Sequence, residues 1–273
     1  MKAEPFPLSG DSFPIVAGPC VIESTEHVLQ MAAALAQARD RLGLALIFKT
    51  SFDKANRSSA ESYRGIALEE ALPIFQQIRA DYKLPVVTDF HTVEQAQQLQ
   101  GAVDVLQVPA FLCRQTDMLQ AAAKTGLPVL VKKGQFLSPW DVGNIADKLR
   151  AAGGADFAIV ERGTSFGYNN LVSDMRAIAI IKEQGIPVIF DASHSAQLPG
   201  ERGKETGGQR EYIPTVARAA VAAGCDGIFI EVHDRPEQAR SDAATQWPLD
   251  RFEELMVSLL AFRKTYLETS GSA

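Results

Sequence analysis

Short, almost continuously apolar segments recur along the chain and alternate with longer segments of helical period. Eight such apolar segments occur, at residues 14–17, 44–48, 85–88, 104–108, 128–131, 157–160, 187–190 and 227–230. Parallel strands covered on both faces have this composition, whereas half-exposed strands alternate between apolar and polar residues. The pattern therefore predicts eight buried parallel strands.

The segments between these strands are rich in Ala, Leu and Gln with helical spacing. Examples are residues 26–42, 61–82, 116–125, 139–152, 169–184 and 212–223. Several of them close on a glycine before the next strand, namely Gly43, Gly126, Gly153, Gly185 and Gly224. Glycine just past a helix is a common stop signal, because it adopts the left-handed conformation without strain.

Eight strand–helix alternations in one chain predict an α/β fold, a (β/α)8 TIM barrel that forms one domain over residues 1–273. A doubly wound open sheet is the structural alternative. The N-terminal segment, with a turn at residues 9–11, is expected to form a small β-hairpin that caps the bottom of the barrel.

Polar and charged side chains follow nearly every predicted strand. They include Lys49, Asp89, Gln107, Lys132, Arg162, Asp191, His194 and Glu231. In a barrel the active site lies where strands end and the following loops begin. This pattern favours binding or catalysis at one mouth over a purely structural role.

The overall charge gives no sign of a polyanionic partner. Among 273 residues, 27 Lys and Arg face 33 Asp and Glu, for a net charge of −6. We therefore expect no nucleic acid and no membrane among the partners. Phosphate binding would need a local group of cations, and Lys49, Lys54, Lys132 and Arg162, with Arg57 nearby, supply one.

Cysteine usage and the N-terminus indicate the compartment. The three cysteines, Cys20, Cys113 and Cys225, are odd in number and form no CxxC pair, which fits a reducing cytoplasm. The first residues lack the apolar region of a signal peptide, and no apolar stretch approaches the roughly 18 residues of a membrane span. We expect a cytoplasmic protein.

A metal site is one interpretation of the residues after the first, seventh and eighth strands. Cys20, His194, Glu231, His233 and Asp242 offer thiolate, imidazole and carboxylate groups. Such a set suits a divalent transition metal such as Zn, Fe, Mn or Co. Glu231 and His233 share a face by strand period, so either could be the eighth-strand ligand. A buried, non-ligating Cys20 and a hydrogen-bonded His194 are the structural alternatives.

Three other functions compete. Residues 163–167 match G-x-S-x-G between a predicted strand and a predicted helix, so Ser165 with Asp191 and His194 would suit a serine hydrolase. A class I aldolase would use Lys132 or Lys133 for a Schiff base. A non-catalytic sugar-phosphate sensor is the third.

Several segments, in order, resemble the 3-deoxy-D-manno-octulosonate 8-phosphate synthase family. They are FKTSFDKANRSS at residues 48–59, QVPAFLCRQTD at 107–117, KKGQF at 132–136, RG at 162–163 with FGYNN at 166–170, DASHSAQLPG at 191–200, and the stretch 225–242. The resemblance spans about residues 16–249.

The resemblance implies a barrel enzyme that condenses phosphoenolpyruvate with D-arabinose 5-phosphate and water in lipopolysaccharide biosynthesis. The related 3-deoxy-D-arabino-heptulosonate 7-phosphate synthases, which use erythrose 4-phosphate, typically have a Lys-Pro-Arg-Thr loop. Here that loop reads KANRSS at residues 54–59, which favours the five-carbon acceptor.

The resemblance also assigns roles to individual residues. Phosphoenolpyruvate would contact Lys49, Lys54, Gln107, Ala110, Lys132, Gln135 and Arg162, and arabinose 5-phosphate would contact Asn56, Arg57, Ser58, Asp89 and Arg114. Arg114 would reach in from a neighbouring subunit of a homotetramer. The sequence Gly18-Pro19-Cys20 resembles the metal-dependent form, whose ligands would be Cys20, His194, Glu231 and Asp242, with His233 outside the ligand set. The groups expected to act in catalysis are Lys49, Lys54, Asp89, Lys132, His194 and Asp242.

Overall fold

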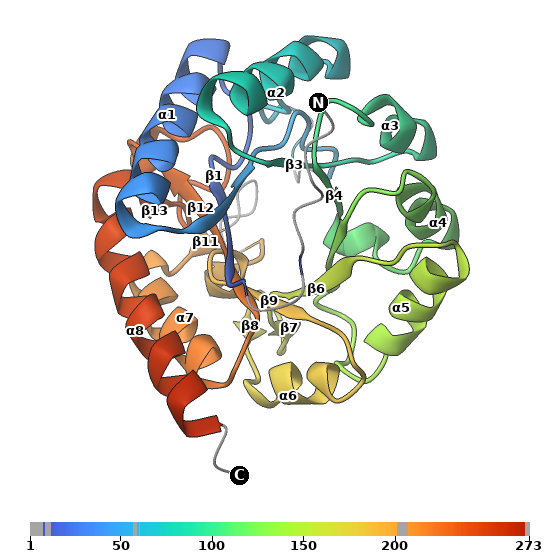
Figure 1. The fold of residues 1–273 in the computed structure, drawn as a ribbon, viewed down its shortest axis with the longest axis vertical. Helices are drawn as coiled ribbons and strands as arrows, with labels where there is room; N and C mark the ends of the chain where they lie inside the picture. Colours follow the sequence, from blue (N-terminus) through green and yellow to red (C-terminus); the bar gives the residue numbers. More distant parts are fainter. Residues whose placement is uncertain (1–7, 9–11, 57–58, 60, 201–206, 271–273) are drawn as a thin grey trace.

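Eight parallel strands close into a barrel inside a ring of helices (Figure 1). The computed structural model describes residues 8, 12–56, 59, 61–200 and 207–270. The barrel strands are β1 (Pro14–Gly18), β2 (Ala45–Lys49), β3 (Val86–Asp89), β4 (Val105–Val108), β5 (Val129–Lys132), β6 (Phe157–Glu161), β9 (Val188–Asp191) and β12 (Gly227–His233). Because β1 pairs in parallel with both β2 and β12, the sheet is closed. The (β/α)8 barrel is confirmed, and the open-sheet alternative is wrong.

The helices follow the strands in regular alternation. They are α1 (Thr25–Leu42), α2 (Leu68–Tyr82), α3 (Val93–Gln98), α4 (Thr116–Lys124), α5 (Val142–Ala151), α6 (Arg176–Lys182), α7 (Ile213–Ala222) and α8 (Phe252–Ser270). Short 3-10 turns, η1 (Ala110–Leu112), η2 (His194–Ala196), η3 (Arg210–Tyr212), η4 (Pro236–Gln238) and η5 (Leu249–Arg251), lie in the connections. At the end of α1, Gly43 has a φ of 64°, and the expected stop signal is confirmed.

The loops at the C-terminal mouth contain further short strands. β7 (Thr164–Ser165) and β8 (Leu171–Val172) form an antiparallel pair after β6, and β10 (Gln197–Leu198) pairs with β11 (Gly207–Gly208) after β9. β13 (Trp247–Pro248) extends the sheet beside β12.

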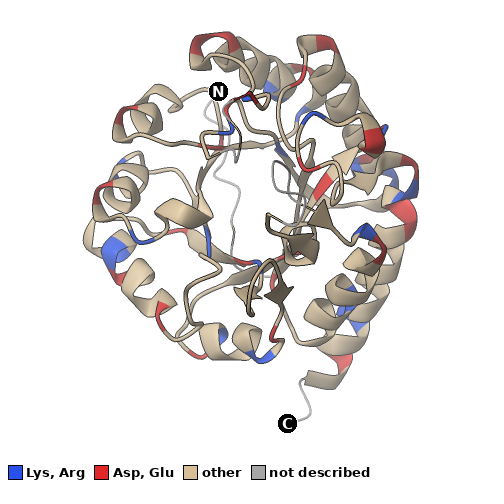
Figure 2. Ribbon diagram, turned by 180° about the vertical axis from the view of Figure 1, so that it is seen from behind, with Lys and Arg blue, Asp and Glu red and all other residues tan. Residues whose placement is uncertain are grey.

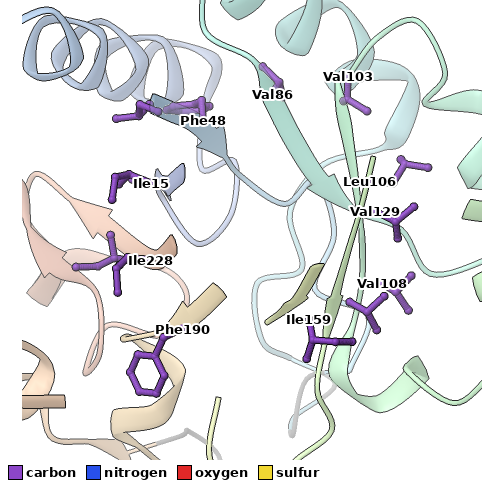
Figure 3. Close-up of a cluster of buried hydrophobic side chains, with 14 of the residues drawn as sticks. Ile15, Phe48, Val86, Val103, Leu106, Val108, Val129, Ile159, Phe190 and Ile228 are labelled. Atoms are coloured by element: carbon purple, nitrogen blue, oxygen red, sulfur yellow. The ribbon is translucent and has the colours of Figure 1, made fainter. Parts of the chain in front are cut away.

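Strand alternation divides the hydrophobic core into two layers. Outward-facing residues pack against the helices, and Figure 3 shows part of this layer, including Phe48, Val129 and Phe190. Inward-facing residues form a second cluster inside the barrel, made of Leu8, Val16, Ile47, Val87, Val105, Leu130, Ala158, Val160, Ile189 and Phe229. Both faces of the strands are therefore buried, which explains their continuous apolarity.

Leu8 belongs to the inner cluster although it precedes the first strand. Its side chain is 1% exposed, and its backbone N–H donates to Asp156 Oδ2 over 3.2 Å. The residue thus helps to close the N-terminal end of the barrel. The hairpin expected around residues 9–11 lies outside the described residues.

Three predicted helices begin clearly later than expected, and the helix predicted for 139–152 differs least, since it begins at Val142. The predicted helix 61–82 begins at Leu68, because residues before it fold back on the loop after β2. There Ile66 N–H donates to the Phe52 carbonyl, and Lys54 N–H donates to that of Arg64. Gly65 permits this close approach, since its φ is 119° and a Cβ would lie 1.9 Å from the Phe52 oxygen. The predicted helix 169–184 begins at Arg176, because the β7–β8 pair takes its first residues.

Charges of both signs are interspersed around the ring of helices (Figure 2). This agrees with the small net charge. Within the described ranges, none of the helices has the length and apolar character that crossing a bilayer requires.

Candidate active site

A polar layer lies directly above the apolar interior of the barrel. In seven strands, the residue two positions after an inner apolar residue is polar: Lys49, Asp89, Gln107, Lys132, Arg162, Asp191 and Glu231. Because strand side chains alternate in direction, these groups also face the barrel axis. All seven are at most 8% exposed.

Five residues of this polar layer, Lys49, Asp89, Gln107, Lys132 and Arg162, line a cavity of about 660 Å³. Eleven residues singled out from the sequence line it: Lys49, Lys54, Asn56, Asp89, Gln107, Ala110, Lys132, Gln135, Arg162, His194 and Asp242. The volume is in the range of small-molecule sites. The C-terminal mouth therefore presents a site whose walls carry several cations.

Lys132, Asp191 and His194 form a chain of contacts on one side of the cavity. The Lys132 ammonium is in contact with Asp191 Oδ2 and lies 3.2 Å from His194 Nδ1. Burial, reinforced by the charge of Lys49 and opposed by Asp191, lowers the pKa of Lys132 to about 8. Burial opposes ionisation of Asp191, but His194 and Lys132 hold its pKa well below the usual range. Asp191 is therefore a buried anion between two basic groups.

Arg162 approaches the cavity from the end of β6. Its Nη2 donates to Gln197 Oε1 over 2.7 Å, and its Nε has no hydrogen-bond partner among the described residues. Gln107 Oε1, Gln135 Oε1 and Asp89 Oδ1 are also buried without a described partner. Unsatisfied buried polar atoms are rare, so these groups are suited to a polar ligand.

The residues proposed as metal ligands converge beside Lys49. One ligand atom each from Cys20, Glu231 and Asp242 lies within 4.8 Å of the others. His194 Nε2 is 3.6 Å from Asp242 Oδ2 and 3.8 Å from Glu231 Oε1. The fourth predicted ligand therefore faces the same point.

The donor set fits a divalent transition metal. Glu231 Oε2 is buried without a hydrogen-bond partner in the described part of the chain. Burial, reinforced by Asp242 and Glu231, raises the pKa of the Cys20 thiol far above its usual value. A cation is needed to stabilise the thiolate among these carboxylates, and thiolate, imidazole and carboxylate together suit a transition metal. Of the two eighth-strand candidates, Glu231 lies in this group, whereas His233 contacts Glu23 and His27.

Two of the groups assigned to the sugar, Asp89 and Asn56, line the cavity. Asp89 Oδ2 lies 3.2 Å from His91 Nε2, and Asn56 lines the wall nearby. Burial opposes ionisation of Asp89, but His91 and Lys54 hold its pKa well below the usual range. Arg57 and Ser58 lie outside the described residues. Arg114 is exposed and is not among the residues that line the cavity.

Sequence reasoning missed several residues of this cavity as site residues. His91, Gln197, Tyr63, Arg240 and Ser241 all line it. His91 lies two residues after the strand-end Asp89, so strand period could have identified it. Tyr63 and the segment around Arg240 come from long loops, where sequence periodicity carries no information.

The structure contradicts the nucleophile-elbow interpretation of residues 163–167. Ser165 is exposed in the β7–β8 pair, its N–H donates to the Gln135 carbonyl, and no helix follows it directly. The motif therefore lacks the required strand–turn–helix context.

Lys133 is also removed from the cavity. Its ammonium is fully buried, donates to the Leu137 carbonyl over 3.0 Å, and lies 3.5 Å from Glu161 Oε2. Of the two Schiff-base candidates, Lys132 alone lines the cavity.

Comparison with known proteins places this barrel in a family. The model of the DAHP synthetase I family matches residues 8–266. A 2-dehydro-3-deoxyphosphooctonate aldolase of Rhodopseudomonas palustris (strain TIE-1) is 56% identical over 93% of this chain and 89% of its own length. Proteins of the same name are 54% identical in Alkalilimnicola ehrlichii and 53% identical in Caulobacter vibrioides, over 90% and 93% of this chain and 89% and 88% of their own lengths. The chain belongs to the DAHP synthetase I family and, within it, to the group of 2-dehydro-3-deoxyphosphooctonate aldolases.

Proposed function

We propose that this protein condenses phosphoenolpyruvate with D-arabinose 5-phosphate and water, giving 3-deoxy-D-manno-octulosonate 8-phosphate and inorganic phosphate. The observation that carries the proposal is the convergence of Lys49, Lys54, Lys132 and Arg162 on one cavity. Two of the potential metal ligands, His194 and Asp242, line the same cavity. The names of the relatives support the same reaction.

The protein's first task is to hold two anions that repel each other. Lys132 and Arg162 bind the phosphate and carboxylate of phosphoenolpyruvate, with Gln107, Ala110 and Gln135 beside them. Asn56, which lines the cavity, is assigned to the sugar phosphate together with Arg57 and Ser58. Fixing both substrates in one orientation accounts for about 7–11 kcal/mol of barrier lowering in favourable cases.

The chemical step forms one C–C bond and breaks one C–O bond. C3 of phosphoenolpyruvate attacks the aldehyde carbon of the open-chain sugar, and the aldehyde oxygen takes up a proton to become a hydroxyl. Water adds its oxygen to C2 and releases a proton. Phosphate then leaves with the bridging oxygen, and C2 becomes the ketone of the product.

Protein side chains organise this step around the reacting atoms. Asp89 orients the acceptor near its aldehyde, and Lys49 and Lys54 stabilise negative charge as it develops. Asp191 keeps the His194 ring oriented through Nδ1. Cys20, His194, Glu231 and Asp242 would hold a divalent metal of the Zn, Fe, Mn or Co type, which supplies a Lewis acid beside the acceptor when bound.

No covalent enzyme intermediate is needed for this sequence of bonds. Borohydride added during turnover is therefore expected to trap no lysine adduct. A stable adduct on Lys132 would instead establish the Schiff-base mechanism. In water labelled with heavy oxygen, we expect the label on C2 and the unlabelled bridging oxygen in the released phosphate.

We also propose a homotetramer in which Arg114 serves the neighbouring subunit's cavity. Arg114 is exposed after β4, and large apolar side chains are exposed on the loops after β4, β5 and β6: Phe111, Phe136, Trp140, Phe166 and Tyr168. Exposed apolar residues on three neighbouring loops are typical of an interface. The enzyme would act in the cytoplasm, where its three free thiols persist, and supply a lipopolysaccharide sugar.

A phosphate-release assay with two acceptors tests the proposed reaction. Phosphoenolpyruvate is offered with D-arabinose 5-phosphate or with D-erythrose 4-phosphate at equal concentration, and kcat/KM is measured for each. We expect a strong preference for the five-carbon sugar. Preference for the four-carbon sugar would reassign the enzyme as a heptulosonate 7-phosphate synthase.

A further inference from the structure

A second group of potential metal ligands lies beside the active site and has no part in the proposed reaction. It comprises Glu23 in the loop after β1, His27 in the first turn of α1, and His233 at the end of β12. One ligand atom from each lies within 4.8 Å of the other two. We call Glu23, His27 and His233 the outer cluster.

The His27 ring is held in an arrangement typical of metal-binding histidines. Its Nε2 lies 3.0 Å from Asp234 Oδ1, so Asp234 accepts the Nε2 proton and fixes the ring. Its Nδ1 is buried and has no hydrogen-bond partner among the described residues. Metal-ligating imidazoles commonly donate one N–H to a carboxylate and use the other nitrogen as the ligand.

His233 is oriented in a complementary way. Its Nδ1 accepts the Arg235 backbone N–H over 2.9 Å, and its Nε2 lies 3.3 Å from Glu23 Oε1. The His233 and His27 rings lie 4.6 Å apart between centroids. A metal ion would replace the Nε2 proton between His233 and Glu23, and the adjacent His27 would add a second imidazole.

We propose that the outer cluster is a second divalent-metal site, distinct from that of Cys20. Two imidazoles and one carboxylate suit a borderline ion such as zinc or cobalt(II) and do not suit calcium or magnesium, which prefer oxygen ligands. Asp234 and two backbone N–H groups, those of Arg235 and Arg240, hold the ligands from outside.

The bound ion would join three segments at the mouth of the barrel. Glu23 Oε1 accepts the Arg240 backbone N–H over 2.8 Å, and Arg240 is followed by Ser241 and Asp242. A metal on the outer cluster therefore secures the loop that presents Asp242 to the cavity. Binding to the folded state alone also stabilises that state.

Cobalt(II) loading of the full-length protein tests the proposal. Metal is removed by chelation, the protein is dialysed against excess cobalt(II), and bound cobalt per chain is measured by atomic emission. A thiolate-to-cobalt charge-transfer band in the near-ultraviolet reports the Cys20 site separately, because the outer cluster contains no sulfur. We expect two cobalt ions per wild-type chain and the charge-transfer band.

Substitutions then assign each ion to its site. His27→Gln, which keeps a side-chain N–H for Asp234, is expected to lose one cobalt and to retain the band. Cys20→Ser is expected to lose the band and to retain the cobalt of the outer cluster. Glu26→Gln, on the exposed side of the same helical turn, is the matched control and should bind two cobalt ions per chain. If His27→Gln does not fold, Glu23→Gln replaces it with the same expectation.

Two results would overturn the proposal. The first is one cobalt ion per wild-type chain with the charge-transfer band present, and the second is two cobalt ions per chain in His27→Gln. Either result would leave the Cys20 site of the proposed function intact. Absence of the band from wild type would instead contradict the Cys20 assignment, while cobalt lost through His27→Gln would still support the outer cluster.

Discussion

Asp191 Oδ2 lies 2.8 Å from His194 Nδ1, and Asp191 Oδ1 accepts the His194 backbone N–H over 2.9 Å. The carboxylate is completely buried, while the imidazole reaches the cavity. Asp191 therefore fixes both the backbone and the ring of a proposed metal ligand. The contact directs Nε2 of His194 toward Glu231 and Asp242.

Replacing Asp191 by Asn should weaken metal binding without removing a ligand. The amide cannot hold the Nδ1 proton as a carboxylate does, and loss of such a partner typically lowers metal affinity about 10–100-fold. Titration with a metal indicator measures the change. Asp226→Asn is the control, because Asp226 holds the Val188 N–H at the opposite end of β9. Equal metal affinity in Asp191→Asn and wild type would contradict the positioning role.

Cys20 should determine metal content and its dependence on pH. Because burial and two carboxylates raise the pKa of the thiol, metal binding must displace a proton, and affinity should fall roughly tenfold per unit as pH drops. Chelation should abolish activity, added divalent metal should restore it, and Cys20→Ser should lose metal. Cys20→Asn puts a neutral amide in place of the thiol and leaves His194, Asp242 and the cations of the cavity intact, so it is expected to keep chelator-resistant activity.

Cys225→Ser supplies the matched control for Cys20. Cys225 is equally buried and free but does not belong to the group of potential metal ligands that contains Cys20. If Cys20 were only a core residue, both substitutions would change stability by about 1–3 kcal/mol and leave metal content unchanged. Equal metal in Cys20→Ser and wild type, measured by atomic emission, would refute the ligand assignment.

Deprotonation of Lys132 should lower kcat/KM for phosphoenolpyruvate at alkaline pH. Its lowered pKa of about 8 means that the free enzyme carries the ammonium below that pH and loses it above. The charged form attracts the anionic substrate, so kcat/KM for phosphoenolpyruvate should fall about tenfold per unit above pH 8. In Lys132→Arg the cation persists, and this limb should disappear even if overall activity is lower. If kcat/KM of Lys132→Arg falls above pH 8 as it does in wild type, the titrating group is not Lys132.

Arg114 and Lys132 should complement each other across subunits. Arg114→Ala should raise KM for arabinose 5-phosphate, and Lys132→Ala should abolish turnover. When the two variants are denatured together and refolded, mixed tetramers contain cavities with an intact Lys132 and a neighbour's intact Arg114. We expect activity above that of either variant refolded alone. No recovery, with mixed tetramers verified by mass spectrometry, would place Arg114 outside the shared site.

Much of the site was predictable because strand period and barrel closure act together. Ile47 faces the apolar interior and Lys49, two residues later, faces the cavity, and the other strands repeat this step. Closure also brings Cys20 within 3.4 Å of Asp242, although 222 residues separate them in sequence. Once the order of the strands is known, sequence patterns predict which of these distant residues lie close together.

The long loops at the mouth were less predictable. Their conformation depends on particular contacts, such as the pairing of Asp53 with Gly65, rather than on any repeating pattern. Helical composition alone therefore misplaced the start of α2. Glu231 and His233 have the same strand parity, yet they enter different clusters, because the segments that pack around them supply different partners.

The inner apolar cluster, which includes Leu8, fills the interior of the described barrel on the N-terminal side of the polar layer. Cys20 and Glu231 are fully buried, and their neighbours Asp242 and His194 line the cavity. A substrate bound in the cavity would separate these ligands from bulk water. An ion held there would then exchange only between turnovers, after the products have left.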